Sequence, residues 1–192
     1  VGSGHSFSPL VPTDGHLLVL DNLTGLVSHD ADKMTAELFA GTRLSDAGRL
    51  LNSIGQAMFN LPDIDRQTLA GAISTATHGT GRDLKSLSGY VQSLRLVTPS
   101  GDVLDLDAEN DSDLFHAARV SLGSLGIITR VGFRNRKPFK LRSRTWTEKT
   151  DAVLDQWSAL TTQWQHFEIM PLLHSDYSFI IAHQETDAPI SP

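Results

Sequence analysis

The sequence lacks cysteine altogether, which excludes disulfides, thiolate metal sites and cysteine nucleophiles. It also lacks an excess of positive charge, because 16 Lys and Arg face 22 Asp and Glu, for a net charge of −6. No basic stripe could release counterions from phosphates, so we exclude a general nucleic-acid binder. No apolar run is long enough to span a bilayer, and none resembles a signal peptide. We therefore expect a cytoplasmic protein without a membrane segment.

Metal-ligand patterns are missing as well, since most histidines stand far apart and show no paired spacing: His16, His29, His116, His174 and His183. We predict no metal site. With 40% apolar residues, a chain of 192 residues can bury one sizeable core and a second small domain. The chain begins at Val1, and Gly2 follows in what reads as the middle of a turn. We expect a truncated or processed chain whose first strands are missing.

Apolar periodicity gives a mixed α+β pattern. Short apolar or alternating runs predict strands at 17–20, 36–40, 91–98, 103–106 and 126–133, and the Pro-Ser-Gly-Asp turn at 99–102 predicts a hairpin. A helix is predicted from the spacing of Ala47, Leu50, Leu51 and Ile54, with Ser45 as its N-cap. A second helix is predicted to start near Ser112 and to stop at Gly123.

The pattern changes near Pro138, after a basic connector at 134–140. Beyond it, a helix is predicted over 147–164, followed by strands of a separate sheet at 166–170 and 177–182. We therefore divide the chain into a domain at 1–137 and the beginning of another at 138–192.

Three separated runs of small residues could bind a ligand. In the first, Gly2-Ser3-Gly4-His5-Ser6, glycines let backbone amides approach an anion such as a pyrophosphate, although a lone Gly-x-Gly is more often an ordinary loop. The second extends from Asp63 to Gly81 and could pack its backbone against a flat ligand, or form a tightly packed helix and turn. The third, at 123–128, is typical of many helix-to-strand junctions.

Together, in this order and spacing, the runs resemble the vanillyl-alcohol-oxidase-type flavoproteins with a PCMH-type FAD-binding domain. The matching residues are Gly2-Ser3-Gly4-His5-Ser6-Phe7-Ser8, Leu69-Ala70-Gly71 through Thr75-Ala76-Thr77-His78-Gly79-Thr80-Gly81, and Gly123-Ser124-Leu125-Gly126-Ile127-Ile128-Thr129. Within these flavoproteins the chain is most similar to sugar-lactone and alditol oxidases, including gulonolactone and arabinonolactone oxidases. The resemblance implies an α+β fold with two α/β subdomains, the first incomplete, followed by the start of a cap domain that contains His166-Phe167-Glu168.

The resemblance also implies a set of cofactor residues. His5 would carry FAD through a bond from an imidazole nitrogen to the flavin 8α-methyl carbon, with noncovalent FAD as the alternative. Gly2, Ser3, Gly4 and Ser6 would cradle the pyrophosphate, and Ile127 or Ile128 would lie against the adenine side. Further positions that match cofactor-lining ones in the family are Asp63, Thr68, Gly71, Thr75, Ala76, Thr77 and His78.

The implied reaction is oxidation of a CH–OH group of a sugar lactone, alditol or related polyol, with electrons passing to oxygen or another acceptor. The flavin supplies the redox chemistry and the protein supplies position and electrostatics. We assign no catalytic base, because the family's substrate-facing residues come mostly from later parts of the chain. An inactive flavin-domain fragment and a noncatalytic binding module remain the alternatives.

Overall fold

Two units make up the structure, a computed structural model that describes residues 1–190. The first comprises Val1–Gly79 and Lys85–Pro138, and the second comprises Thr80–Leu84 and the residues from Phe139 onward. The chain therefore passes from one unit to the other three times. The sequence-based division placed residues 80–84 in the first domain, whereas their contacts group them with the second unit. That the second unit is a cap domain stays a prediction.

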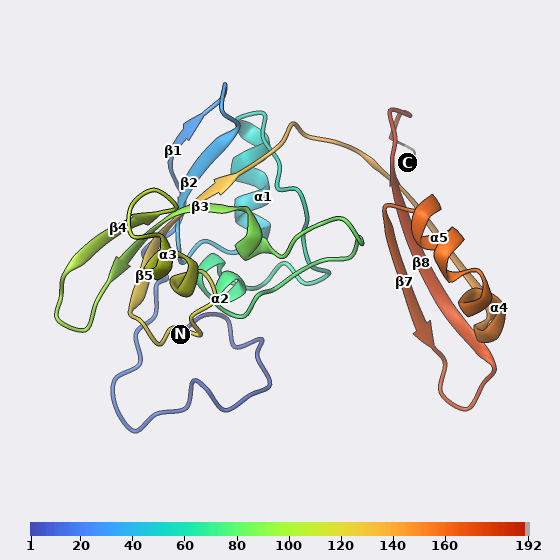
Figure 1. Ribbon diagram of the computed structural model, residues 1–192, viewed down its shortest axis with the longest axis horizontal. Coiled ribbons are helices and arrows are strands. Elements are labelled where there is room, and N and C mark those ends of the chain that lie inside the picture. Colours follow the sequence, from blue (N-terminus) through green and yellow to red (C-terminus); the bar gives the residue numbers. More distant parts are fainter. Residues whose placement is uncertain (191–192) are drawn as a thin grey trace. The chain divides into compact units, whose positions relative to one another are not determined.

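The first unit contains a five-stranded sheet in the order β1-β2-β5-β3-β4, in which every neighbouring pair is antiparallel (Figure 1). Its strands are β1 (Leu26–Asp30), β2 (Thr35–Phe39), β3 (Val91–Val97), β4 (Val103–Asp107) and β5 (Ile127–Arg134). The strand predictions at 36–40, 91–98, 103–106 and 126–133 are confirmed to within a residue or two. The hairpin prediction is confirmed by the antiparallel pairing of β3 with β4.

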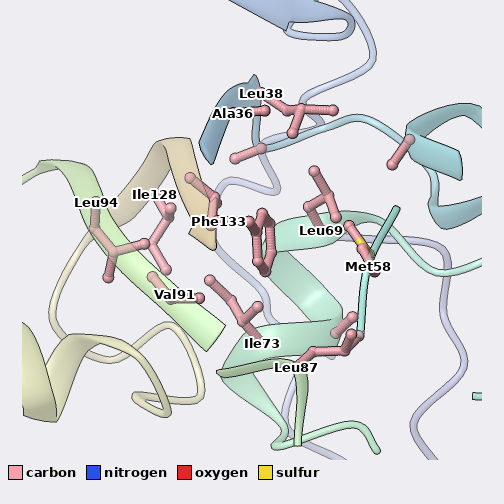
Figure 2. Packing of buried hydrophobic residues seen from close by; sticks show 14 of the residues in the cluster. Ala36, Leu38, Met58, Leu69, Ile73, Leu87, Val91, Leu94, Ile128 and Phe133 are labelled. Atoms are coloured by element: carbon pink, nitrogen blue, oxygen red, sulfur yellow. The ribbon is translucent and has the colours of Figure 1, made fainter. Parts of the chain in front are cut away.

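Four helical segments accompany this sheet: α1 (Leu44–Ser53), α2 (Leu69–Ser74), the 3-10 helix η1 (Leu87–Tyr90) and α3 (Ser112–Ala118). Side chains from the sheet and from α2 form one buried cluster, in which Figure 2 shows Phe133 of β5, Val91 of β3 and Ile73 of α2. Burial of such side chains is the main favourable term in folding. It fixes α2, which carries the second small-residue run, against the sheet.

A polar pair is buried in the same unit. Asn135 donates its side-chain amide to Oε1 of Gln56 at 2.8 Å, and Gln56 donates to the carbonyls of Asp30 and Thr35 at 3.1 and 3.2 Å. Gln56 and Asn135 are only 1% and 3% exposed. These bonds satisfy the side-chain amide of Gln56 and the amide donor of Asn135, whereas Oδ1 of Asn135 is buried without a hydrogen-bond partner among the described residues.

Two predictions for this unit are wrong. Residues 17–20 form no strand but belong to an irregular segment before β1, drawn as a wide loop in Figure 1. Helix α1 begins two residues earlier than expected from a Ser45 N-cap, because Arg43 occupies the cap position without a side-chain hydrogen bond. Backbone carbonyls of Gln67 and Asp65 accept from the amides of Leu44 and Ser45 instead. The helix predicted from Ser112 is confirmed, although it ends at Ala118, before Gly123.

The second unit contains a three-stranded antiparallel sheet in the order β6-β8-β7, with α4 and α5 beside it (Figure 1). Its elements are β6 (Leu141–Lys149), α4 (Thr150–Asp155), α5 (Trp157–Gln163), β7 (His166–Pro171) and β8 (Tyr177–Glu185). The separate sheet is confirmed, but the helix predicted over 147–164 is wrong at its start, where 147–149 still belong to β6, and it breaks at Gln156. Within residues 1–190, none of the helices combines the length and apolarity that crossing a bilayer requires.

Candidate functional site

The three small-residue runs meet in one groove of about 650 Å³ on the first unit. Its wall includes Gly2, Ser3, Gly4, His5 and Ser6 of the first run, Thr68, Gly71 and Thr75 of the second, and Gly123, Gly126, Ile127 and Ile128 at the third. The irregular segment before β1 completes the groove with Leu10, Val11, Leu17 and Leu18, among others. The groove thus has a glycine-rich, polar part and an apolar part, as a long ligand with phosphate and ring portions requires.

Ser3 ties the first run to the second. Its hydroxyl donates to the carbonyl of Arg66 at 2.6 Å. The guanidinium of Arg43 donates to the Ser3 hydroxyl at 3.4 Å and to the same carbonyl at 3.3 Å. Arg43 therefore brings a positive charge to the first run, where a phosphate would benefit from a charge-assisted hydrogen bond.

The backbone of Gly2 approaches α2 closely. A Cβ atom at Gly2 would lie 2.7 Å from Oγ1 of Thr68, which no relaxed contact allows. Thr68 is the N-cap of α2, and its hydroxyl accepts from the amide of Gly71 at 3.3 Å. This approach explains why a residue without a side chain stands at Gly2.

The second and third runs are joined through their backbones. The amide of Leu122 donates to the carbonyl of Ser74, the last residue of α2, at 3.2 Å. From there the chain passes through the third run into β5, where Ile128 is buried and Ile127 is half-buried against the groove. Two loops that are distant in sequence therefore share one wall.

The side chain of Gln67 has one acceptor at the groove without a hydrogen-bond partner within residues 1–190. Its Nε2 donates to the hydroxyl of Thr77 at 3.1 Å. Its Oε1 is buried and has no hydrogen-bond partner among the residues that the structure describes. Because a buried acceptor without a donor is costly, a bound molecule that donates a hydrogen bond here would stabilise the site.

His5 lies at the border between the groove and an adjoining depression that Phe7, Thr75, Val120 and Leu122 also line. Its side chain is exposed, and within residues 1–190 its ring nitrogens have no hydrogen-bond partner. Either nitrogen is therefore accessible to a molecule in the groove.

Not every predicted cofactor residue lines the groove. Asp63 is in an exposed loop, and Ala76, Thr77 and His78 follow α2 without contributing to the wall. Thr77 is connected to it indirectly, through Gln67. The structure brings together the remaining predicted residues: Gly2, Ser3, Gly4, His5, Ser6, Thr68, Gly71, Thr75, Ile127 and Ile128.

The sequence prediction missed other residues of the site. Gln67 belongs to the second run, but its side chain gives no signal until its burial is known. Leu17 and Leu18 were assigned to a strand, and their apolar side chains, 53% and 57% exposed, lie along the groove instead. Arg43 was missed because a single arginine before a helix is common on protein surfaces.

The residues present suit a dinucleotide cofactor. A glycine-rich backbone lines one part of the groove, and Arg43 lies near it. Gln67 provides a buried acceptor without a partner in the described part of the chain. Apolar side chains line the remaining part of the groove. The glycine-rich backbone suits phosphates, and the apolar side chains suit a flat aromatic ring system.

Comparison with solved structures supports the fold. A histidine-to-alanine mutant of cholesterol oxidase from Brevibacterium sterolicum matches with a TM-score of 0.77 over 87% of this chain and 35% of that chain. The sequence identity is 16%, so this likeness concerns the fold alone. It agrees with the α+β class predicted from the sequence.

Curated relatives are sugar-lactone enzymes. The chain is 32% identical to an L-gulono-1,4-lactone dehydrogenase of Mycobacterium tuberculosis, over 100% of this chain and 44% of that protein. It is 36% identical to a D-arabinono-1,4-lactone oxidase of Kluyveromyces lactis, over 84% and 32%. It is 30% identical to an L-gulonolactone oxidase of Bos taurus, over 100% and 43%. The chain spans less than half the length of these relatives.

A protein-family comparison matches residues 1–107 to the FAD binding domain. The matched segment is more than half of the chain and contains the first two runs of the groove. The predicted resemblance is thereby confirmed, and the chain belongs to the family of FAD-binding domains of the PCMH type.

Proposed function

We propose that the groove binds FAD and that the chain serves an oxidoreductase that oxidises a CH–OH group of a sugar lactone, alditol or related polyol. One observation carries this proposal: three runs of small residues, far apart in sequence, line a single groove. The chain is related to sugar-lactone oxidases and dehydrogenases at about 30% identity, which supports a lactone as the first substrate to test.

Different residues of the groove would bind different parts of the cofactor. The backbone amides of Gly2, Ser3, Gly4 and Ser6 would face the pyrophosphate, with the Arg43 guanidinium adding positive charge. Ile127 and Ile128 would pack against the adenine side. The unpartnered Oε1 of Gln67 would accept a hydrogen bond from the cofactor.

FAD held in this groove would supply the redox chemistry, namely acceptance of a hydride and transfer of the electrons to oxygen or another acceptor. The chain's own contribution is to hold and orient the cofactor in the groove. We assign no residue of this chain as the base that removes the hydroxyl proton.

We further propose that FAD is attached covalently at His5. The ring is exposed, borders the groove and has no hydrogen-bond partner within the described part of the chain. A tether at this position would prevent loss of the cofactor. The alternative is noncovalent binding of FAD in the same groove, and the test must distinguish it from covalent attachment at His5.

The first test is titration of the purified chain with FAD, followed by fluorescence of the flavin. Saturable binding with a Kd in or below the micromolar range is expected, and no saturation up to about 1 mM would refute the proposal. Arg43→Gln removes the charge but keeps a hydrogen-bonding side chain, and it should weaken FAD about tenfold, as expected for losing a charge-assisted bond. Arg49→Gln, an exposed change on the same helix, is the matched control.

The second test concerns the reaction. Chain loaded with FAD is mixed anaerobically with L-gulono-1,4-lactone or D-arabinono-1,4-lactone, and loss of the oxidised flavin absorbance is recorded. Bleaching that is reversed by air would support oxidation of a lactone. Flavin that binds but never bleaches with lactones or alditols would refute the substrate class for this chain while leaving FAD binding intact.

A further inference from the structure

The segment Thr80–Leu84, which we call the strap, leaves the first unit after Gly79 and returns to it at Lys85. Within that interval it packs in the second unit. It directly follows residues 75–79, the end of the second small-residue run.

His166, the first residue of β7, makes the hydrogen bonds to the strap. Its Nδ1 lies 3.1 Å from the carbonyl oxygen of Thr80 and 3.1 Å from the Thr80 hydroxyl. His166 is only 7% exposed. The buried imidazole of His166 thus lies within hydrogen-bond distance of both the main chain and the side chain of Thr80.

These contacts decide which ring nitrogen carries the proton. A carbonyl oxygen can only accept, so Nδ1 must donate and Nε2 of the neutral ring must be the acceptor. Nε2 is buried and has no hydrogen-bond partner in the described part of the chain. A second proton would place an unpaired positive charge in this position, which is strongly unfavourable.

Close packing confines the chain on both sides of Thr80. A Cβ atom at Gly79 would lie 2.1 Å from the carbonyl oxygen of Leu61 in the first unit. A Cβ atom at Gly81 would lie 3.0 Å from the carbonyl oxygen of Gln165, the neighbour of His166. Gly79 is thus confined within the first unit, and Gly81 is confined within the second.

The charged and titratable groups around His166 come from three elements. From β8, the His183 ring lies edge-on at 6.2 Å between centroids, and Glu185 also acts on the imidazole. The strap contributes Arg82 and Asp83, which pair with each other at 3.8 Å and are largely exposed. Glu168 follows on β7 itself. The nearest titratable ring, His183, opposes a positive charge on His166.

We propose that His166 is a positioning residue that holds the strap within the second unit, and that protonation of its buried Nε2 releases the strap. This contact of His166 with the strap, which we call the clamp, needs no cofactor.

The test is amide hydrogen exchange of the strap in the FAD-free chain, expressed as protection relative to the intrinsic rate. His166→Leu should lower strap protection at neutral pH about fivefold or more, because a typical hydrogen bond is lost. His166→Asn, whose amide can still donate to the Thr80 carbonyl, should keep most of it. Unchanged protection in His166→Leu would overturn the clamp.

The pH dependence separates a positioning role from simple packing. Wild-type strap protection should fall as the pH is lowered from about 7.5 to about 5, and the His166→Asn variant should show no such fall. An equal fall in both would overturn the proton-dependent release. His183→Asn is the matched control, and strap protection at neutral pH should stay unchanged there, since the structure gives His183 no hydrogen bond to the strap. Exchange of β8 amides in every variant verifies that the second unit is folded.

Discussion

Gly2 lies so close to Thr68 that a methyl group at Gly2 would be 2.7 Å from the Thr68 hydroxyl. That hydroxyl is not free to turn away, because Thr68 is buried and caps α2 through the amide of Gly71. The two glycine-rich runs therefore fit together only while residue 2 has no side chain.

Gly2→Ala should consequently displace the Thr68 cap and widen the groove. Loss of an N-cap costs about 1 kcal/mol, so we expect the Kd for FAD to rise roughly fivefold. Titration of FAD fluorescence measures the change. Gly48→Ala in α1 is the matched control, because a Cβ atom there meets no atom within 4 Å. Equal FAD affinity in the two variants would contradict this account of the groove.

His5→Ala should separate the flavin from the polypeptide. If His5 carries the tether, acid precipitation of the FAD-loaded wild-type chain brings the yellow colour down with the protein, and the variant leaves it in the supernatant. His16→Ala is the control, because His16 also lines the groove and is exposed. Colour that still precipitates with the His5→Ala chain would exclude attachment at this residue.

Gln56→Leu should destabilise the first unit. The change removes the acceptor of the Asn135 amide, which is buried, and the donor to the partly buried carbonyls of Asp30 and Thr35. Each unsatisfied buried group costs about 1–3 kcal/mol, and we expect a loss of about 3 kcal/mol in the free energy of unfolding. Urea denaturation measures it. Gln92→Leu, on the exposed side of β3, should change stability by less than about 0.5 kcal/mol. Similar losses in both variants would argue against the buried network.

Stability should also depend on the protonation of His166. Burial, and secondly the nearby His183, lower the pKa of His166 below its ordinary value of 6.5. Between that lowered pKa and 6.5, the unfolded chain binds more protons than the folded one. The contribution of His166 is therefore complete above pH 6.5 and is lost as the pH falls toward the lowered pKa. Urea unfolding at several pH values should show a steeper acid loss for wild type than for His166→Asn. Identical slopes would refute the assignment.

The sequence predicted most regular elements because their apolar spacing matches what is buried. Two of the edge strands, β1 and β6, gave weaker signals. β1 is half-buried at best along its length, and β6 is exposed except at Trp146, so neither shows a clear apolar face. The start of α1 could not be predicted from local residues, since carbonyls of Asp65 and Gln67 replace the expected side-chain cap.

The groove was predictable as a set of runs and less so as a set of side chains. Glycine spacing indicates where the backbone can approach another group closely, and Gly2 makes such an approach to Thr68. Apolar residues such as Leu17 and Leu18 line the groove rather than a sheet, and hydrophobicity alone does not distinguish these uses. The roles of Gln67 and Arg43 depend on contacts between segments that only folding brings together.

The strap has a consequence for how this molecule can be divided or recombined. A cut after Pro138 would separate Thr80–Leu84 from the strands on which they rest. The smaller piece would then lack Thr80, the hydrogen-bond partner of His166. Exchange of the smaller unit between related proteins would therefore require transplanting two stretches of sequence together.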